Sequence, residues 1–311
     1  MKYLDLQVNG AYGIDFNDDS LSGEGLELAC DKLQESGVAG FLVTIITDSI
    51  DTMCRRIRKI VGILESKPEL GQLVKGIHVE GPFLSNQSGY YGTHPQQHIQ
   101  PANELDTVRL LDAGGGWIRL FTLAPEHDPD CRVIQRLCSD KVLVFAGHTD
   151  ASFETLRRAI DHGLVGFTHL GNGCVHQVDR HDNIVHRVLA LRDRLTITLI
   201  ADGIHLPGWL LQSWLKIIGY ERSIIISDSM SAAGMPPGEY TIGNQSILVE
   251  PSRRTRHRDH GYLAGSASTL QDMDGFLLET LSINPSDRER ILFSNAASLL
   301  LPSVKTSTAC A

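Results

Sequence analysis

Residue types that bind metal ions end three strand-like segments of the chain. The three endings are Val79-Glu80-Gly81, Ala146-Gly147-His148 and Phe167-Thr168-His169, and each follows an apolar run rich in β-formers. One carboxylate and two imidazoles, completed by a water molecule, suit four-coordinate Zn²⁺, and Fe²⁺ accepts the same ligands. A metal held in this way makes hydroxide available near neutral pH. The sequence therefore predicts a metal site formed by Glu80, His148 and His169, in an enzyme that activates water.

A fourth strand-like segment ends in a carboxylate, in the run Ile226-Ser227-Asp228. Beside an activated water molecule, Asp228 can accept the water's proton and pass it to a leaving group. The alternative is that Asp228 caps the following turn or helix, a common role of Asp. The three metal-type endings favour the acid/base role.

Two further histidines and a glycine-rich segment are weaker candidates. His205 follows Asp202-Gly203-Ile204 and can donate to a substrate oxygen, or it can pack as a loop histidine on Trp209. His94 lies on a long polar segment and can donate to a carbonyl oxygen; an exposed histidine is the alternative. The segment Thr168–Gly173 offers backbone N–H groups to a phosphate or carboxylate.

Eight strand-like segments alternate with helix-like ones, which predicts a (βα)8 TIM-like barrel. An open doubly wound sheet is the alternative, but it would gather the polar endings at one switch point rather than spread them over the set. In a barrel they meet at the C-terminal strand ends, where active sites form. The expected strands are Tyr3–Val8, Gly40–Thr47, Leu73–Glu80, Trp117–Ala124, Lys141–Gly147, Leu164–His169, Leu195–Ala201 and Ser223–Ser227.

The segments between these strands carry helical spacing of apolar residues or polar loop composition. Gly81–Asn103 is long and polar, and a loop of this length is usually functional. We expect one domain over residues 1–301, with a hairpin-like insertion at about 235–262 and a disordered tail at 302–311. The expected helices are Gly25–Ser36, Asp51–Glu65, Glu104–Asp112, Phe153–Asp161, Pro207–Ile218 and Ser268–Leu281.

Composition limits the partners that the protein can have. The 311 residues carry a net charge of −9, from 37 acidic and 28 basic residues, which disfavours nucleic acid as the main partner. No apolar run approaches the roughly 20 residues that span a bilayer. The six cysteines are scattered without a CxxC pair, and no secretory leader precedes the first expected strand. We therefore expect reduced thiols in a cytoplasmic protein.

Taken together, these motifs resemble those of N-acetylglucosamine-6-phosphate deacetylases, which belong to the amidohydrolase superfamily. The resemblance extends over roughly residues 3 to 300, with the motifs in the family's order and spacing. The matching segments are Leu4–Gly10, Gly76–Phe83, Gly92-Thr93-His94, Gly147-His148-Thr149, Thr168-His169-Leu170, Ala201–His205, Ser227-Asp228 and Leu263-Ala264-Gly265-Ser266.

The resemblance implies a role for each matching residue. The family would use Glu80, His148 and His169 for the metal, Asp228 as general base and then acid, and His94 to polarise the acetyl carbonyl. The reaction would release acetate from N-acetylglucosamine 6-phosphate. The same resemblance implies substrate contacts at Thr93, His94, Asn172, Gly173, Arg180, Asp202, Gly203, Ile204, His205, Leu263, Ala264 and Gly265.

The end of the first strand separates subtypes of this superfamily. Binuclear amidohydrolases carry His-x-His there, whereas this chain has Gln7-Val8-Asn9. Neither amide is a strong Zn²⁺ ligand. We therefore expect one divalent metal per active site, Zn²⁺ first and Fe²⁺ second.

The chain also departs from the family pattern. The strands that form a flanking β-sandwich in the family are expected to be absent. The loop at Gly171, Gly173 and Cys174 lacks the usual Asn-Ala-Met, and Arg180 lies in the same divergent region. In the family this arginine reaches the phosphate in the neighbouring subunit, which implies a homodimer. The alternatives are a deacetylase of another N-acyl amino sugar (galacto, manno or unphosphorylated) and, more remotely, a non-catalytic sugar-phosphate binder.

Overall fold

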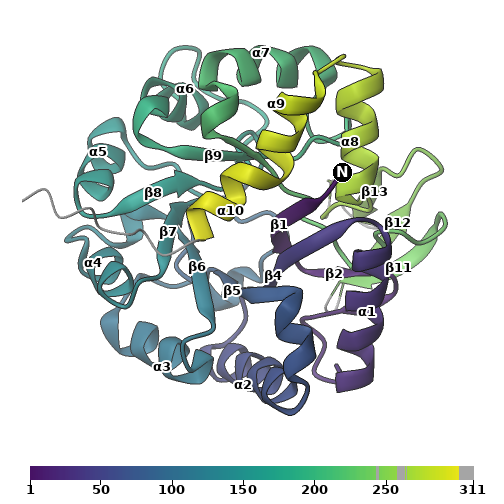
Figure 1. The fold of residues 1–311 in the computed structure, drawn as a ribbon. Helices are drawn as coiled ribbons and strands as arrows, with labels where there is room; N and C mark the ends of the chain where they lie inside the picture. Colours follow the sequence, from purple (N-terminus) through teal and green to yellow (C-terminus); the bar gives the residue numbers. More distant parts are fainter. Residues whose placement is uncertain (243–244, 258–262, 264, 301–311) are drawn as a thin grey trace, which may run out of the picture.

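Eight parallel strands form one sheet in the computed structural model, which describes residues 1–242, 245–257, 263 and 265–300. Their order is β1-β4-β5-β6-β7-β8-β9-β10, the order of the chain. Figure 1 shows them arranged around a common axis with helices outside. The strands are β1 (Tyr3–Val8), β4 (Val38–Ile46), β5 (Val74–Glu80), β6 (Ile118–Leu123), β7 (Leu143–Ala146), β8 (Leu164–Phe167), β9 (Thr196–Leu199) and β10 (Ser223–Ile225).

A backbone bridge and several hydrogen bonds of side chains join the first and last strands of this sheet. Beyond β10, Ser229 forms a parallel bridge with Val8. Asp5 Oδ1 accepts the backbone N–H of Ser227 at 3.1 Å and that of Gln7 at 3.2 Å, while Ser227 Oγ donates to the Gln7 carbonyl at 3.2 Å. The sheet is thus a nearly closed eight-stranded barrel, which confirms the expected architecture against the open doubly wound sheet.

At least one helix follows each barrel strand before the next barrel strand begins. Ser152 caps α5 by accepting the Thr155 backbone N–H at 3.1 Å. The short helices α4, α6, α9 and α10 were not expected. The helices are α1 (Gly23–Glu35), α2 (Ile50–Ser66), α3 (Glu104–Gly114), α4 (Arg132–Ser139), α5 (Phe153–Asp161), α6 (Ile184–Ala190), α7 (Gly208–Ile218), α8 (Leu270–Glu279), α9 (Pro285–Glu289) and α10 (Asn295–Leu300).

The last helices cover the N-terminal end of the barrel. Tyr3 Oη at the start of β1 donates to Asp274 on α8 at 3.0 Å, and Asn295 on α10 donates to the Ser223 carbonyl at 2.7 Å. Arg119, near the start of β6, donates to the Leu300 carbonyl at 2.8 Å. In Figure 1, α10 crosses in front of the barrel strands. The opposite end, where the strands terminate, carries the loops that follow them.

Two small antiparallel sheets stand apart from the barrel. β2 (Gly10–Ala11) pairs with β3 (Ile14–Asp15) directly after the first strand. Within the expected insertion, β12 (Gln245–Val249) pairs with both β11 (Gly238–Ile242) and β13 (Thr255–His257). The expected tail lies outside the described residues.

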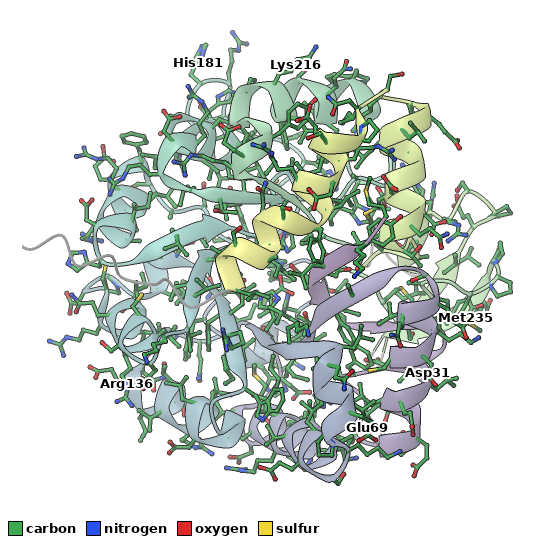
Figure 2. The ribbon with its side chains drawn as sticks, viewed as in Figure 1. Asp31, Glu69, Arg136, His181, Lys216 and Met235 are labelled. Carbon is green, nitrogen blue, oxygen red and sulfur yellow. The ribbon has the colours of Figure 1, made fainter. Side chains whose placement is uncertain are left out.

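Figure 2 shows the charged residues Glu69, Arg136 and Lys216 at the edge of the molecule. In the part of the chain that the structure describes, no helix is long and apolar enough to cross a membrane.

Candidate metal centre and active site

The three expected metal-binding side chains converge at the C-terminal end of the barrel. Glu80 is the last residue of β5, and His148 and His169 follow β7 and β8. Glu80 Oε1 lies 3.3 Å from His148 Nε2 and 3.0 Å from His169 Nε2. One ligand atom from each side chain falls within 4.8 Å of the others, and all three residues are buried. This carboxylate and two imidazoles form a donor set that can hold a divalent metal.

The proton on His148 is placed by its hydrogen bond. Nδ1 lies 2.7 Å from the carbonyl oxygen of Tyr90. Because a carbonyl only accepts, Nδ1 carries a proton, so Nε2, which faces Glu80, is the nitrogen that would bind a metal. Metal-binding histidines have this arrangement, in which the outer nitrogen is fixed by a second partner. His169 presents Nε2 in the same direction, and its Nδ1 is buried without a hydrogen-bond partner.

The electrostatics of the cluster favour an ionised carboxylate. Burial alone would raise the pKa of Glu80, but hydrogen bonds from His148 and His169 outweigh it and hold the pKa well below the usual range. Burial disfavours the charged form of His169, yet the hydrogen bond and charge of Glu80 leave its pKa raised. Protons and a metal ion would therefore compete for the same nitrogen, as metal sites require.

Three of the site residues adopt left-handed backbone conformations that glycine normally occupies. The φ angles are 51° at His148, 34° at His169 and 47° at Asp228. Such conformations cost about 1–3 kcal/mol each for a side chain with a Cβ, and they concentrate at functional sites. The turn that each strand makes as it ends is what directs these side chains over the barrel mouth.

Asp228 lies next to the metal cluster and is held by two amides. Gln7 Nε2 donates to Asp228 Oδ1 at 2.9 Å and to Glu80 Oε1 at 3.0 Å, and Asn9 Nδ2 donates to the same Oδ1 at 2.8 Å. Burial raises the pKa of Asp228, while the charge of His169 and the hydrogen bond from Asn9 oppose that rise. A carboxylate with a raised pKa and one oxygen held by donors is suited to proton transfer.

The sequence had excluded Gln7 and Asn9 as metal ligands but assigned them no task. Here they link the end of β1 to both carboxylates of the site. The only sequence signal for this role was their position at the strand end beside those of Glu80 and Asp228.

His94 reaches the cluster from the long loop between β5 and α3. The backbone N–H of Thr47 donates to His94 Nδ1 at 3.4 Å, and Thr47 Oγ1 lies 2.8 Å from the same nitrogen. An amide N–H can only donate, so the ring proton belongs on Nε2, which points toward Glu80 Oε2 at 3.7 Å. Burial and the neighbouring His148 lower the pKa of His94 to about 3. The ring is thus a neutral donor that is buried rather than exposed.

A cavity of about 420 Å³ opens over the cluster, a volume within the usual range for small-molecule sites. It is lined by Glu80, His148, His169 and Asp228, and by the expected contact residues Thr93, His94, Asn172, Gly173, His205, Leu263 and Gly265. Asp202 stands behind His205, which it holds through a 2.7 Å contact between Oδ2 and Nδ1. Two other expected contacts, Gly203 and Ile204, are not among the lining residues, and Ala264 lies outside the described residues.

Arg180 does not reach this cavity in its own protomer. It is exposed on the segment between β8 and α6, and its neighbour His181 projects from the outer edge of the molecule in Figure 2. Several lining residues were not expected, namely Ser88, Gly89, Tyr91, Cys174, Val175, His176 and Met230. The length of the loop Gly81–Asn103 was the only signal for the first three.

The fold and the site together define a metal-dependent hydrolase of the amidohydrolase type, because a carboxylate, two imidazoles and a second carboxylate meet at the strand ends of a (βα)8 barrel. The N-acetylglucosamine-6-phosphate deacetylase of Bacillus subtilis (strain 168) is 31% identical over 299 residues, 96% of this chain and 74% of that protein. The enzyme of the same name from Lysinibacillus sphaericus is 33% identical over 270 residues, 86% of this chain and 67% of that protein. The chain belongs to the N-acetylglucosamine-6-phosphate deacetylase family.

Solved structures agree with this assignment. The N-acetyl-D-glucosamine-6-phosphate deacetylase of Mycobacterium smegmatis superimposes with a TM-score of 0.86 at 26% identity, covering 96% of this chain and 77% of that one. The corresponding Thermotoga maritima structure gives a TM-score of 0.84 over the same shares. A relative of different name, the N-acetylgalactosamine-6-phosphate deacetylase of Shewanella sp. (strain ANA-3), is 32% identical over 92% of this chain and 70% of its own length. No family model matches the chain.

Proposed function

We propose that the protein hydrolyses the N-acetyl group of N-acetylglucosamine 6-phosphate to glucosamine 6-phosphate and acetate. The observation that carries this proposal is the cluster of Glu80, His148 and His169 with Asp228 alongside, at the base of a cavity that can take a sugar. The names of the relatives supply the substrate.

In this proposal Glu80, His148 and His169 hold one divalent metal, with Zn²⁺ the first candidate and Fe²⁺ the second. When bound, such a metal activates water and polarises a carbonyl oxygen. The structure supports a single ion because Gln7 and Asn9 turn their N–H groups toward Asp228 and, for Gln7, also toward Glu80. Donor groups facing the two carboxylates leave no strong ligand at the strand position where a second metal would bind.

Asp228 performs the proton transfers. Its carboxylate takes a proton from the attacking water as the oxygen bonds to the acetyl carbon, and then delivers that proton to the amide nitrogen as the C–N bond breaks. The products are acetate and a free amine. His94 donates its Nε2–H to the acetyl oxygen, where negative charge develops.

The remaining lining residues bind the sugar and its phosphate. Asn172 and Gly173, in the loop after β8, contact the phosphate. Arg180 reaches the same phosphate from the second subunit of a homodimer. His205, oriented by Asp202, contacts the sugar together with Leu263, Ala264 and Gly265, and Thr93 lies beside His94 in the lining of the cavity. Gly203 and Ile204 contribute to the turn that presents His205, since Asp202 Oδ1 accepts the Ile204 N–H at 2.8 Å.

A second candidate function is deacetylation of another N-acyl amino sugar. The galactosamine-named relative favours the galacto epimer. Unphosphorylated sugars stay in consideration because the described residues that line the cavity include no Lys or Arg. The non-catalytic alternative conflicts with the complete set of ligand and acid/base side chains. We further propose a cytoplasmic location, supported by the free cysteines of the described residues.

Acetate release from a substrate panel tests these proposals. The panel holds N-acetylglucosamine 6-phosphate, its galacto and manno counterparts, and the three unphosphorylated sugars, each with metal-loaded and chelator-treated protein. We expect the highest kcat/KM for the glucosamine phosphate, and none after chelation. A higher kcat/KM for the galacto epimer or for an unphosphorylated sugar would show that the proposed substrate is wrong. If no sugar of the panel releases acetate, the proposal that the protein is an enzyme fails.

A further inference from the structure

Two hydrogen bonds join His148, an expected metal ligand, to the backbone of the long loop Gly81–Asn103. His148 Nδ1 donates to the Tyr90 carbonyl at 2.7 Å, and the backbone N–H of Ser85 donates to the His148 carbonyl at 2.9 Å. Both contacts come from the loop Gly81–Asn103. The orientation of the His148 ring therefore depends on how firmly this loop, and the carbonyl of Tyr90 in particular, is held.

The side chain of Tyr90 is buried next to Asp150. Its phenol is buried near the carboxylate of Asp150, and burial, followed by the charge of Asp150 and then by a hydrogen bond to it, raises the phenol pKa to about 12. The Asp150 backbone is fixed in turn, because its N–H donates to Glu126 Oε1 at 3.0 Å. Thus the carbonyl of Tyr90 contacts His148, while its hydroxyl faces the carboxylate of Asp150.

Arg187 on α6 completes the chain of contacts. Its Nη1 donates to Asp150 Oδ1 at 2.9 Å, to the Asp150 carbonyl at 3.2 Å and to the Ala151 carbonyl at 3.1 Å. Its Nε donates to Asp182 Oδ1 at 2.6 Å. The Arg187 side chain is only 14% exposed, so its charge-assisted bonds to Asp150 and Ala151 are partly shielded from water, which makes them stronger and geometrically specific.

We infer that Arg187, Asp150 and Tyr90 form a positioning relay that sets the affinity of the His148 site for its metal. The relay runs from α6 through the Asp150 carboxylate and the Tyr90 hydroxyl to the Tyr90 carbonyl, which fixes the protonated Nδ1 of His148. Partners that orient a metal-binding histidine change metal affinity by about 10–100-fold when they are removed. This inference rests on the metal site of the proposed function.

Metal titration of the chelator-treated protein tests the relay without using activity. Zn²⁺ is titrated against a competing chelator into the wild type, Tyr90→Phe, Arg187→Met and Arg187→Lys. Tyr90→Phe keeps the carbonyl but loses the tether, so we expect about tenfold weaker binding, and a similar loss for Arg187→Met. Arg187→Lys restores one charge and should lie between. Arg194→Met is the matched control, because it removes an exposed ion pair with Asp161 on the surface.

Two measurements distinguish a role in metal binding from a role in the stability of the fold alone. The relay predicts altered ligand-field bands in the Co²⁺-loaded Tyr90→Phe and Arg187→Met variants and weaker metal binding by both, whatever change their metal-free unfolding temperatures show. Metal affinities within twofold of wild type would overturn the relay, even if the variants unfold at lower temperature. If the wild type itself binds no Zn²⁺, the metal site of the proposed function fails, which is a different result from the one that removes the relay alone.

Discussion

Asn9 controls Asp228 through one hydrogen bond, and this bond can be removed with little else changing. Its Nδ2 donates to Asp228 Oδ1 at 2.8 Å, whereas its Oδ1 is buried without a hydrogen-bond partner. The hydrogen bond stabilises the ionised carboxylate and so lowers the pKa of Asp228 against the effect of burial. A substitution of Asn9 therefore changes the pKa of Asp228 while leaving the expected metal ligands in place.

Replacing Asn9 by Ala should move the acid limb of the activity profile. The base works only when ionised, so activity falls as pH drops through the pKa of Asp228. Loss of the donor raises that pKa, and the acid limb of log kcat/KM should shift upward by about one pH unit, since hydrogen bonds to charged groups contribute about 1.5–3 kcal/mol. An unshifted limb, with metal content equal to wild type, would mean that another group limits the rate at low pH.

Asp228→Asn should remove proton transfer while the metal stays. The amide cannot accept the water's proton, and loss of general acid/base help typically lowers kcat about 10²–10⁴-fold. Bound metal, counted by elemental analysis, should equal that of wild type, because the ligand set is Glu80, His148 and His169. His148→Ala is the contrasting variant and should lose metal. Near wild-type kcat in Asp228→Asn would remove Asp228 from the mechanism.

At the level of elements, Asp5 joins the first and last strands of the barrel. It is fully buried and accepts backbone N–H groups from both sides of the β1–β10 seam. Burial raises its pKa from 3.8 to about 7, even though hydrogen bonds from Ser227 and Gln7 oppose the rise. The seam is therefore closed by a carboxyl group whose ionised form is disfavoured by the fold.

This arrangement predicts that the stability of the seam depends on pH. Below about pH 3 Asp5 is protonated in both the folded and the unfolded state, so its titration has no effect on stability there. As pH rises toward 7, the unfolded state ionises first and the folded state is destabilised relative to it, by roughly 2–4 kcal/mol at pH 8. Asp5→Asn keeps the accepting oxygen and cannot ionise. In urea unfolding of metal-free protein, the variant should match wild type near pH 3 and exceed it at pH 8; a difference independent of pH would contradict this.

The elements show how far the sequence predicts the fold. All eight barrel strands were expected, with ends within a few residues, because each is a short β-branched run bounded by Gly or polar residues. The helices α4, α6, α9 and α10 were not expected, because they span only 8, 7, 5 and 6 residues, and helices this short depend on packing rather than on local propensity. Likewise the ligand set was predictable because each member ends a strand, whereas the contacts of Thr47, Tyr90 and Arg187 join segments distant in sequence.

At the level of the whole molecule, the position of Arg180 bears on assembly. It is exposed and does not line the cavity of its own protomer, while the proposed phosphate role requires a second subunit. The segment around it departs from the family, so sequence alone could not place it. The assembly can be probed by combining two defects in one dimer.

Mixing Arg180→Ala with Asp228→Asn should restore activity. Each homodimer is impaired, but a hybrid dimer has one site with an intact Asp228 that receives Arg180 from the other subunit. After subunit exchange at a substrate concentration below KM, we expect up to about a quarter of wild-type activity in the mixture, because about half of the dimers are hybrid and each has one complete site. Exchange without restored activity would show that Arg180 does not act across the dimer.

The left-handed backbone at His148, His169 and Asp228 also bears on how this barrel can evolve. A descendant released from selection for hydrolysis gains free energy of folding by placing glycine or asparagine at these three turns, where the present side chains have no conformational advantage. Drift in a retired copy should therefore be directional rather than random at these positions. Glycine or asparagine there, in an otherwise well-preserved barrel, marks a relative that has exchanged catalysis for stability.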